Sequence, residues 1–143
     1  MMTQSPALIP ELDVTDLQRS LRFYVDLLGF SVGVERPEER FAYLVRGEVH
    51  LMLEEATGPG RRFRTAELKH PFGRGVNLQI RVDDVDVLYA SVLVAPWPMI
   101  IELEERWYRQ SRIERGNRQF VIADPDGYLL RFFGDLGSRA AMM

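Results

Sequence analysis

Two side chains near residue 50, His50 and Glu54, have the types that acid–base chemistry requires. His50, Met52 and Glu54 alternate in a β-prone stretch, and alternate residues of a strand point to the same side. A histidine and a carboxylate on one face could form a proton relay, because histidine titrates near neutral pH. A histidine that is simply exposed or satisfied in the core is the alternative interpretation. The spacing leaves both interpretations open.

A second candidate is Arg131, in the strand that follows an Asp-Pro-Asp-Gly turn at residues 124–127. Asp can cap its own backbone, Pro sets φ and Gly tolerates positive φ, so this segment predicts a β-hairpin. Arg131 stands between two bulky apolar residues on one face of the returning strand. It could bind an anionic group of a ligand, or it could pair with Glu54 or Glu11 and stabilise the fold. Both roles remain hypotheses.

Large aromatic side chains are candidates for stacking on a ligand. Trp107 and Tyr108 are adjacent in a polar stretch that predicts a loop before the final hairpin, and Phe41 begins a strand-like segment. Aromatic rings bind planar molecules through their faces. Burial of the Trp-Tyr pair in a dimer interface is the alternative.

Two alternating segments predict strands with one apolar and one polar side. The polar side of residues 7–14 includes Glu11, and the polar side of residues 76–82 includes Asn77 and Gln79. If the apolar sides pack under helices, the polar sides line a ligand site. The candidate ligand-binding residues are therefore Glu11, Phe41, His50, Met52, Asn77, Gln79, Trp107, Tyr108 and Arg131.

A helix is expected after each of these strands. Thr15 and Gln18 have the spacing of a capping box, and Asp84 is placed to cap the second helix. The helical spacing predicts that the first helix buries Leu17, Leu21, Val25 and Leu28. Leu8 is expected to share the buried side of the preceding strand with Leu12.

The two halves of the chain repeat. A shift that superposes Leu12 on Ile80 also superposes Asp16 on Asp84. Further strands are predicted at residues 31–35, 41–46, 49–54, 99–103, 116–123 and 128–134, with a frayed tail at 138–143. The sequence thus predicts an α+β fold in which two βαβββ modules, residues 7–55 and 76–135, are joined by a linker of residues 56–75 in one domain spanning residues 1–143.

The composition excludes several classes of protein. The chain has 143 residues, no cysteine and a net charge of −3. It therefore has no disulfide, thiolate nucleophile or cysteine metal site, and its dispersed basic residues do not form a nucleic-acid surface. The start lacks the pattern of a signal peptide, and the longest apolar run, residues 92–101, is too short to span a bilayer. We expect a cytoplasmic protein with a small-molecule partner, without direct nucleic-acid or membrane binding.

Three segments together resemble the vicinal oxygen chelate superfamily, which includes glyoxalase I, extradiol dioxygenases, fosfomycin-resistance enzymes and bleomycin-resistance proteins. They are residues 16–30, residues 81–86 and the turn at residues 124–127. The resemblance extends over nearly the whole chain and is closest in character to the bleomycin-resistance type. It implies that the two modules form a cup-shaped curved sheet and that the protein is a homodimer.

The resemblance also implies where a metal would bind. Metal-using relatives carry His or Gln on the first strand and Glu on the last strand of each module, facing the cup. Alignment by the helix-start aspartates and the final turn places Ile9, Met52, Asn77 and Arg131 there. Ile has no donor atom, Met prefers soft metals, Asn is a weak ligand and Arg adds positive charge. We expect no catalytic metal and no cofactor.

The resemblance and the missing ligands favour a metal-free protein that sequesters an antibiotic or another aromatic compound at a dimer groove. In bleomycin-resistance proteins a Trp before the final hairpin stacks on the drug, but residues 108–115 are an insertion relative to that pattern. The alternative is a metal-dependent glyoxalase-like lyase or extradiol-type dioxygenase, with His50 and either Glu54 or Glu11 as ligands. A ligand-sensing regulatory module is a third hypothesis.

Overall fold

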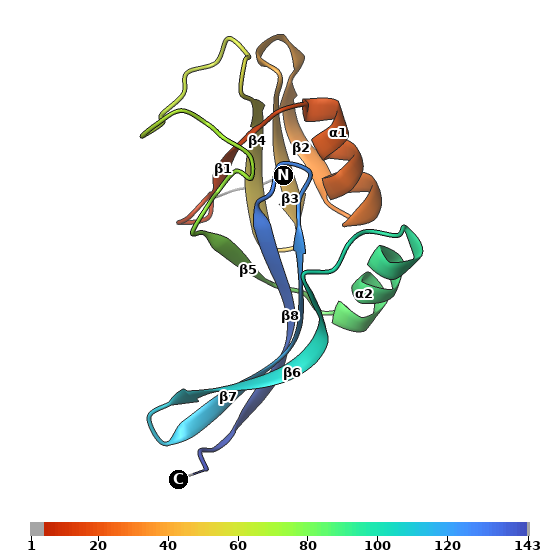
Figure 1. Ribbon diagram of the computed structural model, residues 1–143, viewed down its shortest axis with the longest axis vertical. Coiled ribbons are helices and arrows are strands. Elements are labelled where there is room, and N and C mark those ends of the chain that lie inside the picture. Colours follow the sequence, from red (N-terminus) through yellow and green to blue (C-terminus); the bar gives the residue numbers. More distant parts are fainter. Residues whose placement is uncertain (1–4, 143) are drawn as a thin grey trace. The chain divides into compact units, whose positions relative to one another are not determined.

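Strands and helices follow one another in the same order in both halves of the chain (Figure 1). The computed structural model describes residues 5–142, which divide into two units, residues up to 69 and residues from 70 onward. The first unit contains β1 (Glu11–Val14), α1 (Leu17–Leu21), a π-helix (Arg22–Leu27), β2 (Ser31–Arg36), a 3-10 helix (Pro37–Glu39), β3 (Phe41–Arg46) and β4 (Val49–Glu55). The second contains β5 (Asn77–Arg81), α2 (Val85–Val94), β6 (Ile101–Gln110), β7 (Ile113–Ala123) and β8 (Leu129–Ala140).

The same sheet topology is built twice. Each unit has a four-stranded sheet, with the order β1-β4-β3-β2 in the first and β5-β8-β7-β6 in the second. The first strand of each unit pairs in parallel with the last, and the other pairs are antiparallel. Leu12 lies opposite Leu53, and Ile80 lies opposite Phe132, so the sequence repeat superposes equivalent positions. The predicted α+β fold of two βαβββ modules is confirmed.

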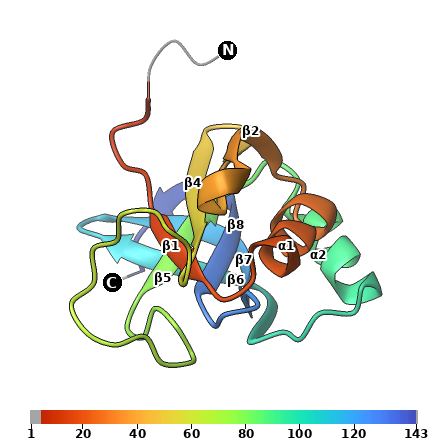
Figure 2. The same cartoon turned by 90° about the horizontal axis from the view of Figure 1, so that it is seen from above.

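One face of each sheet is buried, and the helices of the two units are seen from above in Figure 2. In the first unit Leu53 of β4 and Tyr24 of the π-helix are both 0% exposed. In the second unit the rings of Phe120 and Phe132 lie 5.5 Å apart, and Tyr89 of α2 meets Phe120 at 5.2 Å. Because strand side chains alternate, the remaining residues of each strand point to the opposite, open face. No helix of residues 5–142 is long and apolar enough to cross a membrane.

The first helix is capped by a different residue from the one that the sequence predicts. Arg19 N donates to Asp16 Oδ1 at 3.1 Å, and Asp16 is the N-cap. The predicted capping box of Thr15 and Gln18 is therefore wrong by one position. Asp is as good an N-cap as Thr or better, and its carboxylate interacts favourably with the positive end of the helix.

The buried face of the first helical segment also differs from the prediction. Leu21 and Val25 are only partly buried, whereas Phe23 and Tyr24 fill the core. The reason is the π-helix Arg22–Leu27, which carries i to i+5 bonding, as in the 3.1 Å bond from Leu28 N to Phe23 O. Wider turns rotate later side chains away from the face that a 3.6-residue period predicts.

The first strand is shorter than the alternation of apolar residues predicts. It begins at Glu11, and Leu8, expected to be buried, is 82% exposed. Pro10 precedes the strand and has no N–H to donate, although its carbonyl accepts from Met52 N at 2.9 Å. Leu12 and Val14 are buried as predicted.

The last three strands are much longer than predicted, and they form the long ribbon that extends beyond α2 in Figure 1. Ile113 lies opposite Ala140, so residues 138–140 are part of β8 and the prediction of a frayed tail is wrong for them. Trp107 and Tyr108 lie in β6 and not in a loop. This part of the ribbon carries polar residues on both faces, and it therefore lacks the apolar alternation that marks a half-buried strand.

The pairing of Trp107 with Gly116 across this ribbon generates a stability prediction. A Cβ atom on Gly116 would lie 2.7 Å from the indole ring, which Arg139 covers from 4.0 Å. We expect Gly116→Ala to lower the free energy of unfolding by about 1–3 kcal/mol, because the indole must move. Urea unfolding, monitored by circular dichroism, measures the free energy of unfolding. The control is Gly33→Ala, whose new Cβ makes an ordinary 3.4 Å contact; equal losses in both variants would contradict the packing argument.

Candidate functional site

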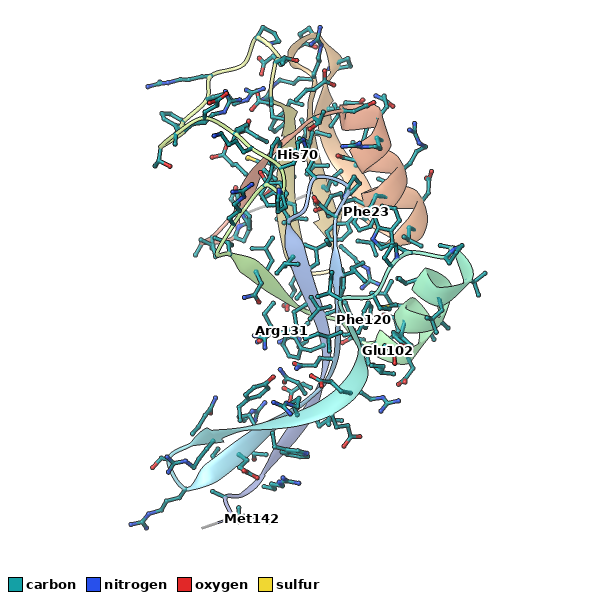
Figure 3. The ribbon with its side chains drawn as sticks, viewed as in Figure 1. Phe23, His70, Glu102, Phe120, Arg131 and Met142 are labelled. Atoms are coloured by element: carbon teal, nitrogen blue, oxygen red, sulfur yellow. The ribbon has the colours of Figure 1, made fainter. Side chains whose placement is uncertain are left out.

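The open face of the β5-β8-β7-β6 sheet is hollowed into a cavity of about 360 Å³, to which all four strands contribute. Its lining residues are Gln79, Arg81, Tyr108, Gln110, Arg115, Asn117, Arg131, Phe133 and Asp135. Figure 3 shows Arg131 and Phe120 on opposite sides of this sheet. The volume lies within the range of about 300–1,000 Å³ that small-molecule sites occupy. We call this hollow the arginine cavity.

A buried amide organises the wall of the arginine cavity. Gln119 is 3% exposed, and its Nε2 donates to the Tyr108 hydroxyl at 2.7 Å and to Glu104 Oε2 at 3.1 Å. Asn117 Nδ2 donates in turn to Gln119 Oε1 at 3.4 Å. Both donors and the acceptor of Gln119 are thus engaged within the wall. Its role is to hold Tyr108 in place and not to contact a ligand.

Tyr108 offers the cavity both a hydroxyl group and a ring. Its oxygen accepts from Gln119 and, at 3.4 Å, from Arg131 Nη1. A phenol has two acceptor sites and one donor, so the hydroxyl hydrogen remains for a third partner. The ring centroid lies 5.9 Å from the guanidinium carbon of Arg131. A ligand in the cavity can therefore accept a hydrogen bond from Tyr108 and contact its ring.

Arg131 carries a charge that no carboxylate of residues 5–142 pairs with. Its side chain projects from β8 between Gln79 on β5 and Val121 on β7. Its hydrogen bond to the described part of the chain is the long one to Tyr108, and its Nε is buried without a partner. A guanidinium group has five N–H donors, so most of the hydrogen-bonding capacity of Arg131 is unused.

The lining of the arginine cavity is positively charged although the whole chain is acidic. Three arginines and one aspartate line the cavity, and the carboxylate of Glu104 lies behind them, bound to Gln119. Asp135 is engaged by Arg115, whose Nη2 lies 2.7 Å from Asp135 Oδ2. Arg131 therefore adds a positive charge that Asp135 does not balance, against a net charge of −3 for the protein. The cavity attracts anions more than cations.

Trp107 lies on the other face of β6. Its ring covers Gly116 and lies 4.0 Å from the guanidinium carbon of Arg139, which pairs with Glu114 at 2.7 Å. Neighbouring residues of a strand point to opposite faces, so Tyr108 lines the arginine cavity and Trp107 does not. The predicted pair of stacking aromatics is thus divided between two surfaces.

The open face of the first sheet carries a second cavity of about 680 Å³. Its lining includes three predicted residues, Glu11, Phe41 and Met52, together with Val34, Arg36, Glu39, Tyr43, Glu54, Pro59, Gly60 and Arg61. Phe41 is only 3% exposed, and the guanidinium carbon of Arg36 lies 3.9 Å from its ring centroid. Phe41 is therefore covered by an arginine, which leaves little of its ring for a ligand.

His50, Met52 and Glu54 share the open face of β4, as their spacing predicts. They lie opposite Val45, Tyr43 and Phe41 respectively. His50 Nδ1 lies 2.7 Å from the Tyr43 hydroxyl, while Glu54 pairs with Arg62. Four strand residues span about 13 Å, so His50 and Glu54 are too far apart for the direct proton relay considered above. His50 lines neither of the cavities described here.

Arg62 fixes the loop that follows β4 onto the first sheet. Its side chain is 13% exposed, its Nε lies 2.9 Å from Asp13 Oδ1, and its Nη1 pairs with Glu54. A further bond runs from its Nη2 to the carbonyl of Glu55. Arg64 adds two bonds of 3.2 Å to the carboxylate of Asp13. We call this set of ion pairs the Arg62 clamp.

The donor set does not fit a divalent metal ion. In the parallel strand pairs Met52 lies opposite Glu11, and Arg131 lies opposite Gln79. A thioether and a guanidinium group are poor partners for the hard cations that carboxylates bind. Ile9 precedes β1 and has no donor atom. Among residues 5–142 no group of three or more His, Asp or Glu side chains could hold a metal.

Asn77, the remaining candidate, is exposed opposite Leu129 and lines neither cavity. Several residues of these faces were not among the candidates, including Arg62, Asn117, Gln119 and Phe133. Asn117 and Gln119 are two positions apart, and Gln119 precedes the core residue Phe120. The two-residue period of a strand therefore indicates that both amides lie on the open face. No sequence signal indicates the partners of Arg62, because they come from β1 and β4.

Comparisons with known proteins agree with this fold. The family model described as Glyoxalase/Bleomycin resistance protein/Dioxygenase superfamily matches residues 10–132. A bleomycin resistance protein of Geobacillus stearothermophilus is 31% identical over 139 residues, which cover 91% of this chain and 97% of that protein. A bleomycin resistance protein of Staphylococcus aureus has the same identity and coverage.

Solved structures give the same result at the level of fold. TioX from Micromonospora sp. ML1 has a TM-score of 0.70 and 22% sequence identity, covering 92% of this chain and 99% of its own. A protein of unknown function from Agrobacterium tumefaciens has a TM-score of 0.66 and 25% identity, covering 94% and 98% respectively. These two likenesses support the fold and do not identify a ligand.

The Arg62 clamp generates a prediction about the loop at residues 56–64. Arg62→Met removes the charge that pairs with both Asp13 and Glu54 and leaves Asp13 paired with Arg64 alone. We therefore expect a loss of about 1–3 kcal/mol in the free energy of unfolding and faster amide exchange in the loop. Hydrogen exchange with mass spectrometry measures the second effect. Arg61→Met is the matched control, because it removes the same charge from a side chain that stacks on Phe63. Equal exchange in both variants would contradict the clamp.

Proposed function

The chain belongs to the glyoxalase/bleomycin resistance protein/dioxygenase superfamily, and on that premise we propose that it binds and sequesters a small aromatic molecule in the arginine cavity. The proposal does not involve a metal. The arrangement of Gln119, Tyr108 and Arg131 carries it, because the wall of the cavity is already held in place by its own hydrogen bonds. A preorganised site binds a ligand at a lower cost in conformational entropy.

The chemistry of the lining favours binding over catalysis. Its side chains are arginines, amides, Tyr108, Phe133 and Asp135, and Asp135 is already paired with Arg115. The lining contains no serine, threonine, histidine or lysine that could act as a nucleophile with an adjacent base. The arginines and amides of the lining can donate hydrogen bonds that orient a ligand, and the two aromatic rings can pack against it. These are the features of a binding site.

The relatives support an antibiotic as the ligand. Two proteins 31% identical to this chain are called bleomycin resistance proteins, and sequestration of a compound without chemical change is a means of resistance that a binding cavity can provide. Our proposal includes a homodimer with the ligand at a groove between subunits, and a cytoplasmic location. The homodimer and its groove come from the resemblance of the sequence to this type of protein.

The binding proposal predicts that Tyr108, and not Trp107, contributes to the affinity for a ligand. Isothermal titration calorimetry with metal-free bleomycin, 2-naphthoate and 2-naphthamide tests it, and we expect at least one of them to bind with saturable heat. Tyr108→Ala should weaken that binding about tenfold, because it removes both the ring and the hydroxyl donor. Trp107→Ala is the control, since Trp107 lies on the other face of the same strand. Absence of binding by all three probes, or an equal loss in both variants, would contradict the proposal.

The enzymatic alternative predicts a bound metal. We expect the protein, after dialysis against zinc, manganese, nickel and iron(II) salts, to retain much less than one metal ion per chain, because Met52 and Arg131 are poor ligands. Mass spectrometry of the metal content measures this, with His50→Ala as the comparison. Stoichiometric metal in the wild type that is lost in His50→Ala would overturn the binding proposal and favour a lyase or a dioxygenase.

A further inference from the structure

We infer that the ligand of the arginine cavity is an aromatic acid whose carboxylate binds Arg131. The inference rests on the proposed function and names the chemical class of the molecule that the site takes. An aromatic acid differs from neutral and cationic aromatic compounds in its negative charge. Membership of the superfamily alone does not distinguish between these classes of ligand.

The hydrogen-bonding state of Arg131 is the first argument. Its Nη1 makes one long bond of 3.4 Å, to a neutral hydroxyl, and no carboxylate of residues 5–142 pairs with it. A charged group that is only partly exposed loses hydration, and it recovers that energy only through a charged or strongly polar partner. The pairs Arg115–Asp135 and Arg139–Glu114, both at 2.7 Å, show how other arginines of the same sheet are neutralised. Arg131 lacks such a partner, and an anionic ligand supplies one.

The geometry of the surrounding donors is the second argument. The Tyr108 hydroxyl accepts from Arg131 and Gln119, so its remaining hydrogen is a donor beside the guanidinium group. Gln79 lies opposite Arg131 on β5, and its amide adds another donor to the lining. A carboxylate accepts about four hydrogen bonds and matches the planar fork of a guanidinium group. An ammonium group on a ligand has no acceptor for these donors, and it would lie beside the positive charge of Arg131.

The rings of Tyr108 and Phe133 are the third argument. Both line the cavity, Tyr108 from β6 and Phe133 from β8. They supply apolar contact for the body of a ligand whose charged end is held by Arg131. A cavity of about 360 Å³ holds one planar molecule of two or three rings with its acidic group. An aromatic carboxylic acid satisfies all three features at once.

A matched pair of probes tests the inference. The affinities of 2-naphthoate and 2-naphthamide, which have the same body and differ in charge, are measured by calorimetry at low and high chloride concentration. We expect naphthoate to bind about tenfold or more tightly than naphthamide at low salt, and this preference to shrink at high salt because screening weakens the charge interaction. Arg131→Gln should abolish the preference, and Arg131→Lys should retain part of it.

Arg139→Gln is the matched control, because Arg139 lies on the other face of the ribbon against Trp107. It should leave the preference for naphthoate unchanged. Equal binding of both probes, or an unchanged preference in Arg131→Gln, would overturn the inference about the acid while the proposed binding function stands. Failure of both probes and of bleomycin to bind would overturn the binding function and the inference together. Circular dichroism of each variant separates a lost contact from a lost fold.

Discussion

The parallel pairing of β5 with β8 sets which side chains of these two strands face the arginine cavity. This register places Gln79 opposite Arg131 and Ile80 opposite Phe132. A slip of one residue would exchange the two faces, so that Arg131 entered the core and Phe132 entered the cavity. Burial of an unpaired guanidinium group costs several kcal/mol, and this cost excludes the slipped register. The same constraint that forms the core therefore also forms the site.

The duplicated topology carries different chemistry on its two open faces. At the position equivalent to the Gln79–Arg131 pair, the first unit has Glu11 and Met52. Carboxylates on that face, Asp13 and Glu54, are neutralised from within the chain by the Arg62 clamp. The second unit instead leaves the charge of Arg131 without a carboxylate partner among the described residues. One topology thus gives one face whose charges are neutralised within the chain and one face that is suited to an external anion. The difference lies in the side chains and not in the fold.

Polar groups of the second sheet act at two depths. Gln119 is buried and uses its donors and its acceptor on Tyr108, Glu104 and Asn117, so that it shapes the wall. Tyr108 and Arg131 lie nearer the cavity. Each keeps hydrogen-bond donors for a ligand, whereas the donors of Gln119 are already engaged. This division allows the buried layer to fix the position of the exposed one.

Much of this protein was predictable from local pattern. The periods of the apolar residues indicated the βαβββ order and the common face of His50 and Met52, and the residue types Asp-Pro-Asp-Gly indicated the turn at residues 124–127. Strand and helix periods and turn chemistry are short-range properties. Tertiary structure decided the rest. Trp107 and Tyr108 are separated because an almost wholly polar ribbon continues as paired strands, and Arg64 reaches Asp13 from 51 residues away. Such contacts depend on register and long-range pairing, which neighbouring residues do not encode.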